Sequence, residues 1–188
     1  GIACIIAFAA STLVGGAALA KDLYVATNGN DGVSYASNSE ASPWQTLERA
    51  IPSLQAGDTL YIRQGTYRPS STIQVDSRTG VGSTGTQSSP IHITSYPGEA
   101  VTIDLASVGT FIFIVDLHYW EISNLEFVNA LVMIDVGGTA LETRNITVRN
   151  NRIVMNRGGD NAAAVKVGNA ANTVVDGNEI VGPGNGSG

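Results

Sequence analysis

The sequence predicts an all-β fold: a solenoid of stacked coils with an N-terminal capping helix. The first observation behind this prediction is the composition, because glycine makes up 22 of 188 residues while charged residues make up 14% and hydrophobic residues 43%. This balance is typical of ordered, turn-rich β structure and not of a disordered chain. The other two observations are an internal repeat and one amphipathic segment near the N-terminus.

The internal repeat occupies the second half of the chain. Three segments superpose at spacings of 26 and 27 residues: Ile122–Val128, Val148–Val154 and Val175–Val181. A second set of apolar pairs has spacings of 20 and 33 residues: Ile112/Ile114, Val132/Ile134 and Val165/Val167. Both sets advance 53 residues over two repeats, which indicates coils of constant construction joined by loops of variable length.

No helical pattern separates these strands, so equivalent strands must pair in parallel with those of the next coil, about 4.8 Å away. The residues expected to point inward alternate along the strands: Trp120 and Ile122, then Ile146 and Val148. Asn151 and Asn178 share one turn position, where asparagine tolerates a left-handed backbone and stacks on its counterpart.

The segment from Ser42 onward predicts the capping helix, with Ser42 as N-cap and Pro43 at the first helical position. Pro52 ends or bends it early. The apolar residues on one helical face are Trp44, Leu47, Ile51 and Leu54. Such a helix covers the open end of a stack of coils. We assign residues 21–90 to this cap and the first coils, and residues 91–188 to the β-helix repeats.

Residues 1–20 are interpreted as a partial signal peptide. They carry no charge, and Ala18-Leu19-Ala20 fits the rule for cleavage after Ala20. The alternative is an uncleaved membrane anchor, because about 20 apolar residues span a bilayer. We expect cleavage, a secreted or cell-surface protein and no stable membrane insertion afterwards. At the other end the chain stops directly after a repeat, so we expect a β-helix truncated at its C-terminus.

Charge and motifs exclude several functions. The net charge of −6 argues against nucleic acid as a partner. The single cysteine excludes a disulfide scaffold and a four-cysteine zinc site. The run Gly80–Gly85 matches G-x-G-x-x-G, but it lies in a Ser/Thr-rich loop with no helical pattern after it. We therefore predict no dinucleotide cofactor.

Four motifs carry a family resemblance: Asn28–Gly32, Ser42–Ala50, Ala56–Arg68 and Ser89–Glu99. They resemble the opening of secreted right-handed parallel β-helix proteins of the pectate-lyase-like kind. The nearest groups are the family 9 pectate lyases and the alginate lyase/chondroitinase B group. The resemblance covers about residues 24–180 and implies a right-handed parallel β-helix that acts on acidic polysaccharide.

The resemblance also implies a mechanism. Such lyases cleave uronate-containing polysaccharide by β-elimination, in which a base removes the C5 proton beside the uronate carboxylate. That proton becomes acidic enough only when the carboxylate charge is neutralised, and in many members Ca²⁺ does this while Lys or Arg acts as the base. We therefore expect Ca²⁺ as the cofactor.

Several outward residues are candidates for this chemistry. Lys166 is the candidate base, with Asp135 in a neighbouring column one coil back as its partner; a solvated surface ion pair is the alternative. Phe113 and Met133 share the column of Lys166. These two residues, with Phe111 and Tyr119 nearby, are expected to form a sugar-stacking platform or to pack under the loop 76–90. The candidate metal ligands are Asp160, Asp176 and Glu179, and the alternative is polar loop residues.

Two functions from different classes remain. The leading hypothesis is a secreted polysaccharide lyase, and the alternative is a non-catalytic β-helix that binds glycans or forms a surface structure. Ice binding would require ranks of Thr-x-Thr on one face, and only scattered threonines occur.

Overall fold

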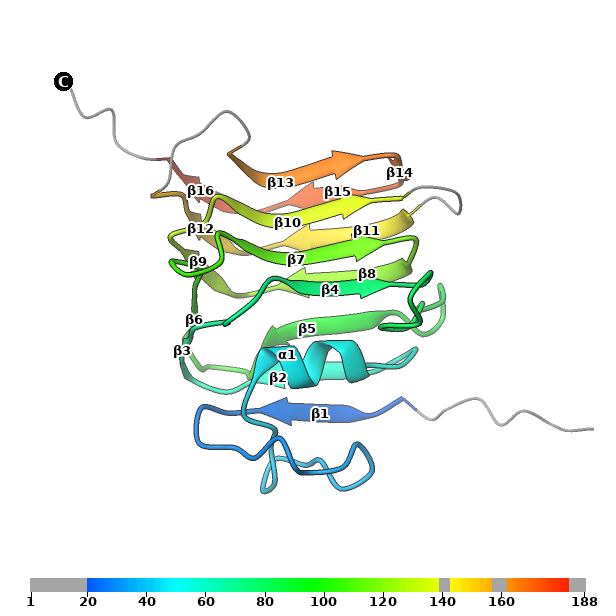
Figure 1. The fold of residues 1–188 in the computed structure, drawn as a ribbon, viewed down its shortest axis with the longest axis vertical. Helices are drawn as coiled ribbons and strands as arrows, with labels where there is room; N and C mark the ends of the chain where they lie inside the picture. Colours follow the sequence, from blue (N-terminus) through cyan, green and yellow to red (C-terminus); the bar gives the residue numbers. More distant parts are fainter. Residues whose placement is uncertain (1–19, 139–142, 157–161, 183–188) are drawn as a thin grey trace, which may run out of the picture.

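The computed structural model describes residues 20–138, 143–156 and 162–182 of the chain. Their strands form three sheets in which the paired strands run parallel, and each successive coil adds a strand to a sheet (Figure 1). The chain is therefore a parallel β-helix, as the repeats predict. The predicted signal peptide lies almost wholly outside the described residues.

The largest sheet has seven strands. They are β1 (Asp22–Val25), β2 (Thr59–Ile62), β5 (Ile91–Ser95), β8 (His118–Ser123), β11 (Thr143–Arg149) and, both paired with β11, β14 (Ala170–Ala171) and β15 (Val174–Asp176). The four-stranded sheet holds β4 (Ile73–Asp76), β7 (Thr110–Val115), β10 (Val132–Gly137) and β13 (Ala163–Gly168). The five-stranded sheet holds β3 (Gly65–Tyr67), β6 (Val101–Asp104), β9 (Glu126–Val128), β12 (Arg152–Val154) and β16 (Glu179–Val181).

The strand registers confirm the first repeat set and correct the second. Ile122 aligns with Val148, which aligns with Val175, as predicted. On the four-stranded sheet, however, Ile112 aligns with Ile134 and not with Val132. The predicted pairing was wrong by two residues, because the alternation continues past Ile134 to Val136 and offers two equivalent matches.

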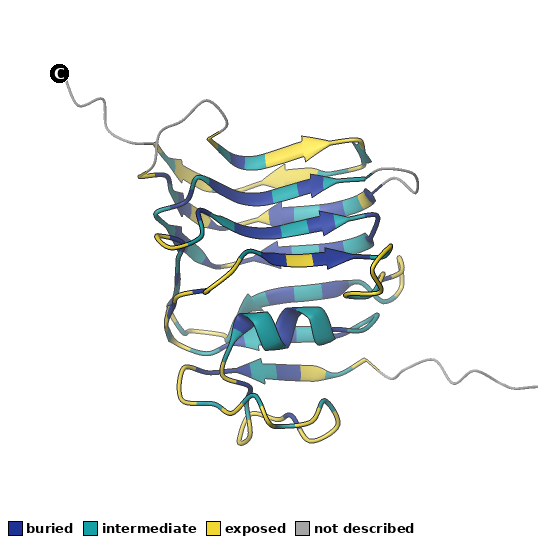
Figure 2. Cartoon of the chain, viewed as in Figure 1, coloured by how far each residue is buried: buried dark blue, intermediate teal, exposed yellow. Residues whose placement is uncertain are grey.

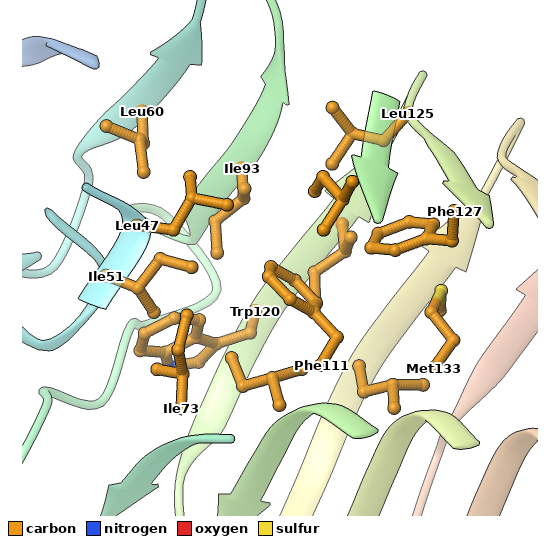
Figure 3. Packing of buried hydrophobic residues seen from close by; sticks show 14 of the residues in the cluster. Leu47, Ile51, Leu60, Ile73, Ile93, Phe111, Trp120, Leu125, Phe127 and Met133 are labelled. Carbon is orange, nitrogen blue, oxygen red and sulfur yellow. The ribbon is translucent and has the colours of Figure 1, made fainter. Parts of the chain in front are cut away.

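The inward side chains meet in one continuous core. Trp120, Phe111 and Phe127 are buried, and the rings of Phe111 and Phe127 lie 5.1 Å apart (Figure 3). Burying each such side chain stabilises the fold by roughly 1.5–3 kcal/mol. The last described coil is less covered (Figure 2), because Val167, Val175 and Ile180 occupy inward columns and are 47%, 47% and 53% exposed.

Stacked asparagines hold one corner of the coils. Asn151 accepts the backbone N–H of Leu125 at 3.1 Å and donates to the carbonyl of Ile122 at 3.0 Å. Asn178 repeats this one coil later, accepting from the backbone and side chain of Asn151 at 3.0 Å. The predicted stacking of Asn151 on Asn178 is confirmed.

The left-handed residues at this corner are not the predicted ones. They stand one position earlier: Asn124, Asn150 and Gly177, with φ of 58°, 53° and 61°. The prediction for Asn151 and Asn178 was wrong because their amides turn inward to bond the backbone of the preceding coil.

The N-terminal edge of the stack is closed by side chains and one extended residue. The Asn38 side chain accepts the N–H of Tyr24 at 2.7 Å and donates to its carbonyl at 2.9 Å. Trp44 lies extended beside β1, donating to the Tyr24 carbonyl at 2.9 Å and accepting from Ala26 N–H at 2.8 Å. The backbone groups of Tyr24 and Ala26 on this open edge are thereby paired.

This pairing of Trp44 explains why the predicted helix start at Ser42-Pro43 was wrong. Helix α1 (Leu47–Ala50) begins after Thr46, whose hydroxyl accepts the Arg49 N–H at 3.2 Å, and a 3₁₀ turn η1 (Ile51–Ser53) comes next with Pro52 inside it. The predicted apolar face is nevertheless buried: Trp44, Leu47, Ile51 and Leu54 are each at most 1% exposed. Strand β4 was not predicted.

The asparagine stack gives a stability prediction. Asn151→Ala leaves the Leu125 N–H and the Ile122 carbonyl without the side chain that bonds them, so we expect a loss of about 2 kcal/mol or more in the free energy of unfolding. Asn156→Ala is the matched control, because Asn156 is exposed and donates to Asn129 at 3.1 Å. This substitution should lower the free energy of unfolding by no more than about 0.5 kcal/mol. Urea unfolding followed by circular dichroism measures both; equal losses would contradict the role of the buried stack.

A buried aspartate gives a pH prediction. Asp76 accepts hydrogen bonds from Arg78 Nη2 at 2.6 Å and Nε at 2.9 Å, and this pairing lowers its pKa to about 2. The folded state binds this proton more weakly than the unfolded state, so the stabilisation is present above about pH 4 and is lost as pH falls through about 2.

The measurement compares the wild type with Asp76→Asn across pH. The difference in free energy of unfolding should be constant above pH about 5 and should narrow between about 4 and 2. Asp22→Asn, at an exposed carboxylate of β1, serves as the control. If the difference in free energy of unfolding between the two proteins does not change with pH, the charge of Asp76 is not what stabilises the fold.

Candidate functional site

A column of polar and aromatic side chains runs across the outer face of the four-stranded sheet. Gln74 of β4 aligns with Phe113 of β7, Phe113 with Asp135 of β10, and Asp135 with Lys166 of β13. The side chains of Asp135 and Lys166 are 20% and 54% exposed, and Phe113 is half-buried. The structure therefore brings together, in adjacent strands, an aromatic ring, a carboxylate and an ammonium group.

Simple alternation places these residues outward. Phe113 lies between buried Ile112 and Ile114, and Asp135 lies between buried Ile134 and Val136. Successive side chains of a strand point to opposite faces. The apolar neighbours face the core and so fix the outward direction of the polar residues.

Lys166 and Asp135 form an ion pair, with Lys166 Nζ 3.0 Å from Asp135 Oδ2. Because both groups reach solvent, the pair contributes only about 0–1 kcal/mol to stability. An ammonium has three donors and no acceptor, so this group is suited to binding an anion.

A flat strip of backbone lies beside this column. Gly137 of β10 aligns with Gly168 of β13, two residues along from Asp135 and Lys166. A methyl group built on Gly168 would meet nothing within 4 Å, and one on Gly137 only the Gly168 carbonyl oxygen at 3.3 Å. A flat ligand thus has access to the backbone here.

Two predicted placements were wrong. Met133 is 0% exposed and points into the core beside Phe111 (Figure 3), so it forms no outward platform. Lys166 shares its column with Asp135 and Phe113, whereas the prediction placed Asp135 in a neighbouring column. The column error arises from the two-residue register shift on the four-stranded sheet. Such a shift leaves each side chain on the same face, so the burial of Met133 has another cause: alternation breaks at the start of β10, where Val132, Met133 and Ile134 are all buried.

The candidate metal ligands are not assembled by the described residues. Asp160 lies outside them. Asp176 and Glu179 are exposed, and Glu179 Oε2 is 3.2 Å from Arg152 Nε. No group of three His, Cys, Asp or Glu side chains suited to a metal ion occurs in the part of the chain that the structure describes. With Asp160 outside the described residues, the calcium site stays a prediction.

One feature was missed by sequence reasoning: a groove of about 340 Å³ on the outer face of the seven-stranded sheet. Its lining includes Tyr119, whose φ of 57° is unusual for a bulky residue. Glu121 in the same groove pairs with Arg149 at 2.8 Å and lies 3.7 Å from His92 Nδ1. The signal was available, because Tyr119 stands 26 residues before Asn145 in the repeat.

The geometry defines the chain as a parallel β-helix with polar columns on its outer faces. The chain belongs to the family described as "Pel9A-like, right handed beta helix region", whose model matches residues 23–180. The resemblance inferred from the N-terminal motifs is confirmed, and with it the right-handed parallel β-helix.

Similar proteins agree with this family. Pectate lyase PEL9 of Emericella nidulans is 34% identical over 155 residues, which cover 72% of this chain and 35% of that relative. The chain thus spans about a third of the length of the curated relative that it matches.

Solved structures share the fold. Pectate lyase Pel9A superposes with a TM-score of 0.60 at 20% identity, over 82% of this chain and 38% of that chain. A rhamnogalacturonan lyase gives a TM-score of 0.57 at 15% identity, over 85% and 51%. A lacto-N-biosidase from Eubacterium ramulus gives a TM-score of 0.55 at 17% identity, over 71% of this chain and 27% of that chain.

In the described part of the chain no helix has the length and apolar character needed to cross a membrane.

The ion pair gives a further stability prediction. Lys166→Met removes the charge but keeps an unbranched side chain, so the free energy of unfolding should change by at most about 1 kcal/mol. Thermal unfolding of the wild type and of Lys166→Met at two salt concentrations measures this change in free energy. A larger loss would show that the pair holds β10 and β13 together and is not available for ligands.

Proposed function

We propose that this chain is part of a secreted polysaccharide lyase that cleaves uronate-containing polysaccharide by β-elimination. The observation that carries the proposal is the match of residues 23–180 to the Pel9A-like β-helix family, together with 34% identity to a pectate lyase. Acidic polysaccharide as the substrate is inferred from that likeness. Secretion is part of the proposal, since a polymer of this kind is met outside the cell.

The reaction sets the chemical demands. A base takes the C5 proton of the uronate, the electrons of that C–H bond form the C4–C5 double bond, and the C4–O bond breaks with the leaving group taking a proton. The carboxylate beside C5 must be paired with positive charge, since it would otherwise resist the build-up of negative charge next to it.

Lys166 meets the demand for positive charge. Its ammonium is half-exposed at the end of the column and is held 3.0 Å from Asp135. We assign it to binding a uronate carboxylate and not to proton abstraction, because an ammonium paired with a carboxylate must lose its proton before it acts as a base. This revises the role that the sequence predicted.

Phe113 and Asp135 complete the proposed surface. The half-buried ring of Phe113 aligns with Asp135 on the neighbouring strand and offers an apolar face for a sugar ring. Asp135 positions Lys166 through their ion pair. Calcium dependence stays a prediction, because the described residues do not build its site.

A glycan-binding protein without catalysis is the second candidate. One observation favours it: in the described residues the cation of this column is already paired with a carboxylate, and no metal-binding group accompanies it.

The experiment expresses the complete open reading frame and mixes the folded protein with polygalacturonate, alginate or chondroitin, with calcium or with a chelator. We expect ultraviolet absorbance of the unsaturated uronate to rise on polygalacturonate and to vanish with chelator. No rise on any polymer, together with binding of one of them, would replace the lyase by the non-catalytic binder.

Two variants separate binding from base catalysis. Lys166→Ala should raise KM roughly tenfold, the loss of about 1.4 kcal/mol of charge pairing, with kcat little changed. Lys166→Arg keeps the charge and should restore most of the affinity. If Lys166 were the base, Lys166→Ala would instead lower kcat by orders of magnitude and leave KM little changed.

A further inference from the structure

We infer that the groove centred on Tyr119, on the outer face of the seven-stranded sheet, is a binding site for neutral oligosaccharide. It lies on the other side of the core from the column that ends in Lys166, because β8 and β11 stand behind β7 and β10 (Figure 1). The inference is independent of lyase activity, and its readout is binding.

The backbone of Tyr119 is the first observation. Tyr119, Asn145 and Asn172 occupy the same corner of successive coils, and all three have a left-handed backbone, with φ of 57°, 56° and 53°. Asparagine adopts this conformation readily, whereas a bulky aromatic residue is strained in it. Strain of this kind concentrates at functional sites, and here the ring of Tyr119 lines the groove.

The lining of the groove is the second observation. Next to the corner column runs an outward column of aligned residues: His92, Glu121, Thr147 and Val174. Asn172 Nδ2 donates to Asn145 Oδ1 at 3.3 Å. The Nδ2 group of Asn145 and the Oδ1 atom of Asn172 remain for other partners. An aromatic ring beside hydroxyl, amide and carboxylate groups is the set that recognises the apolar faces and hydroxyls of sugars.

The spacing of the coils fits a sugar chain. Coils repeat every ~4.8 Å along the axis, close to the length of one pyranose unit in an extended chain. The corner column therefore offers one polar or aromatic contact per sugar unit, from Tyr119 to Asn145 to Asn172.

The charges of the groove favour a neutral sugar. Glu121 accepts from Arg149 at 2.8 Å, so the Arg149 guanidinium is already matched by a carboxylate. A uronate entering the groove would bring a second carboxylate next to Glu121. A chain of neutral, hydroxyl-rich sugars meets no such repulsion.

The test uses two variants at Tyr119. Tyr119→Asn removes the ring but suits the left-handed corner, as in the next two coils, so the melting temperature should not fall. Tyr119→Phe keeps the ring and removes the hydroxyl. Asn156→Ala, at an exposed asparagine outside the groove, is the control.

Calorimetry titrates the protein with cellohexaose, xylohexaose, mannohexaose and hexagalacturonate. We expect at least one neutral hexasaccharide to bind, with Kd raised at least about tenfold by Tyr119→Asn, and less by Tyr119→Phe. Amide chemical shifts should move at His92 and Thr147 and not at Asp135. The proposal is overturned if no neutral hexasaccharide binds, if Tyr119→Asn keeps wild-type affinity, or if hexagalacturonate is the ligand that depends on Tyr119.

Discussion

The whole molecule depends on keeping equivalent strands in parallel register from coil to coil. A single coil cannot bury its own apolar side chains, so Trp120 must lie over Ile146 and Ile122 over Val148. A slip of one residue would turn every side chain of a strand to the opposite face. The register that builds the core is therefore the same constraint that aligns Asp135 with Lys166 on the outside.

This constraint creates an open edge at the first coil, and buried polar groups close it. Besides Asn38 and Trp44, Asp58 connects three segments there: its carboxylate accepts from Lys21 N–H at 3.1 Å, from the Tyr35 hydroxyl at 2.9 Å and from Gln55 N–H at 2.8 Å. Burial and the bond to Asp58 raise the pKa of Tyr35 to about 12. The N-terminal loops are thus fixed by specific hydrogen bonds, where later coils rely on repeated strand pairing.

The strength of each periodic signal explains how much the sequence could predict. The repeat around Ile122, Val148 and Val175 carries a distinctive Asn/Gly turn, so its register was predicted correctly. The strand holding Val132, Ile134 and Val136 offers two equivalent alignments, and Met133 was placed outside when it is buried.

The helix start was missed because a tertiary contact of Trp44 with β1 overrides the local Ser-Pro signal. The groove at Tyr119 depends on backbone strain and on contacts between coils, so the repeat that aligns Tyr119 with Asn145 indicates the column but not the groove itself.

The outward-facing positions differ in residue type from one coil to the next. The coil that contains β7 and β8 places Phe113 in a column otherwise formed by Gln74, Asp135 and Lys166. The same coil places Tyr119 in a column continued by Asn145 and Asn172. Inward columns must stay apolar to pack, but outward columns carry no such demand. One coil therefore presents an aromatic ring on each of two sheets without disturbing the core, and ligand recognition can change there while the fold stays constant.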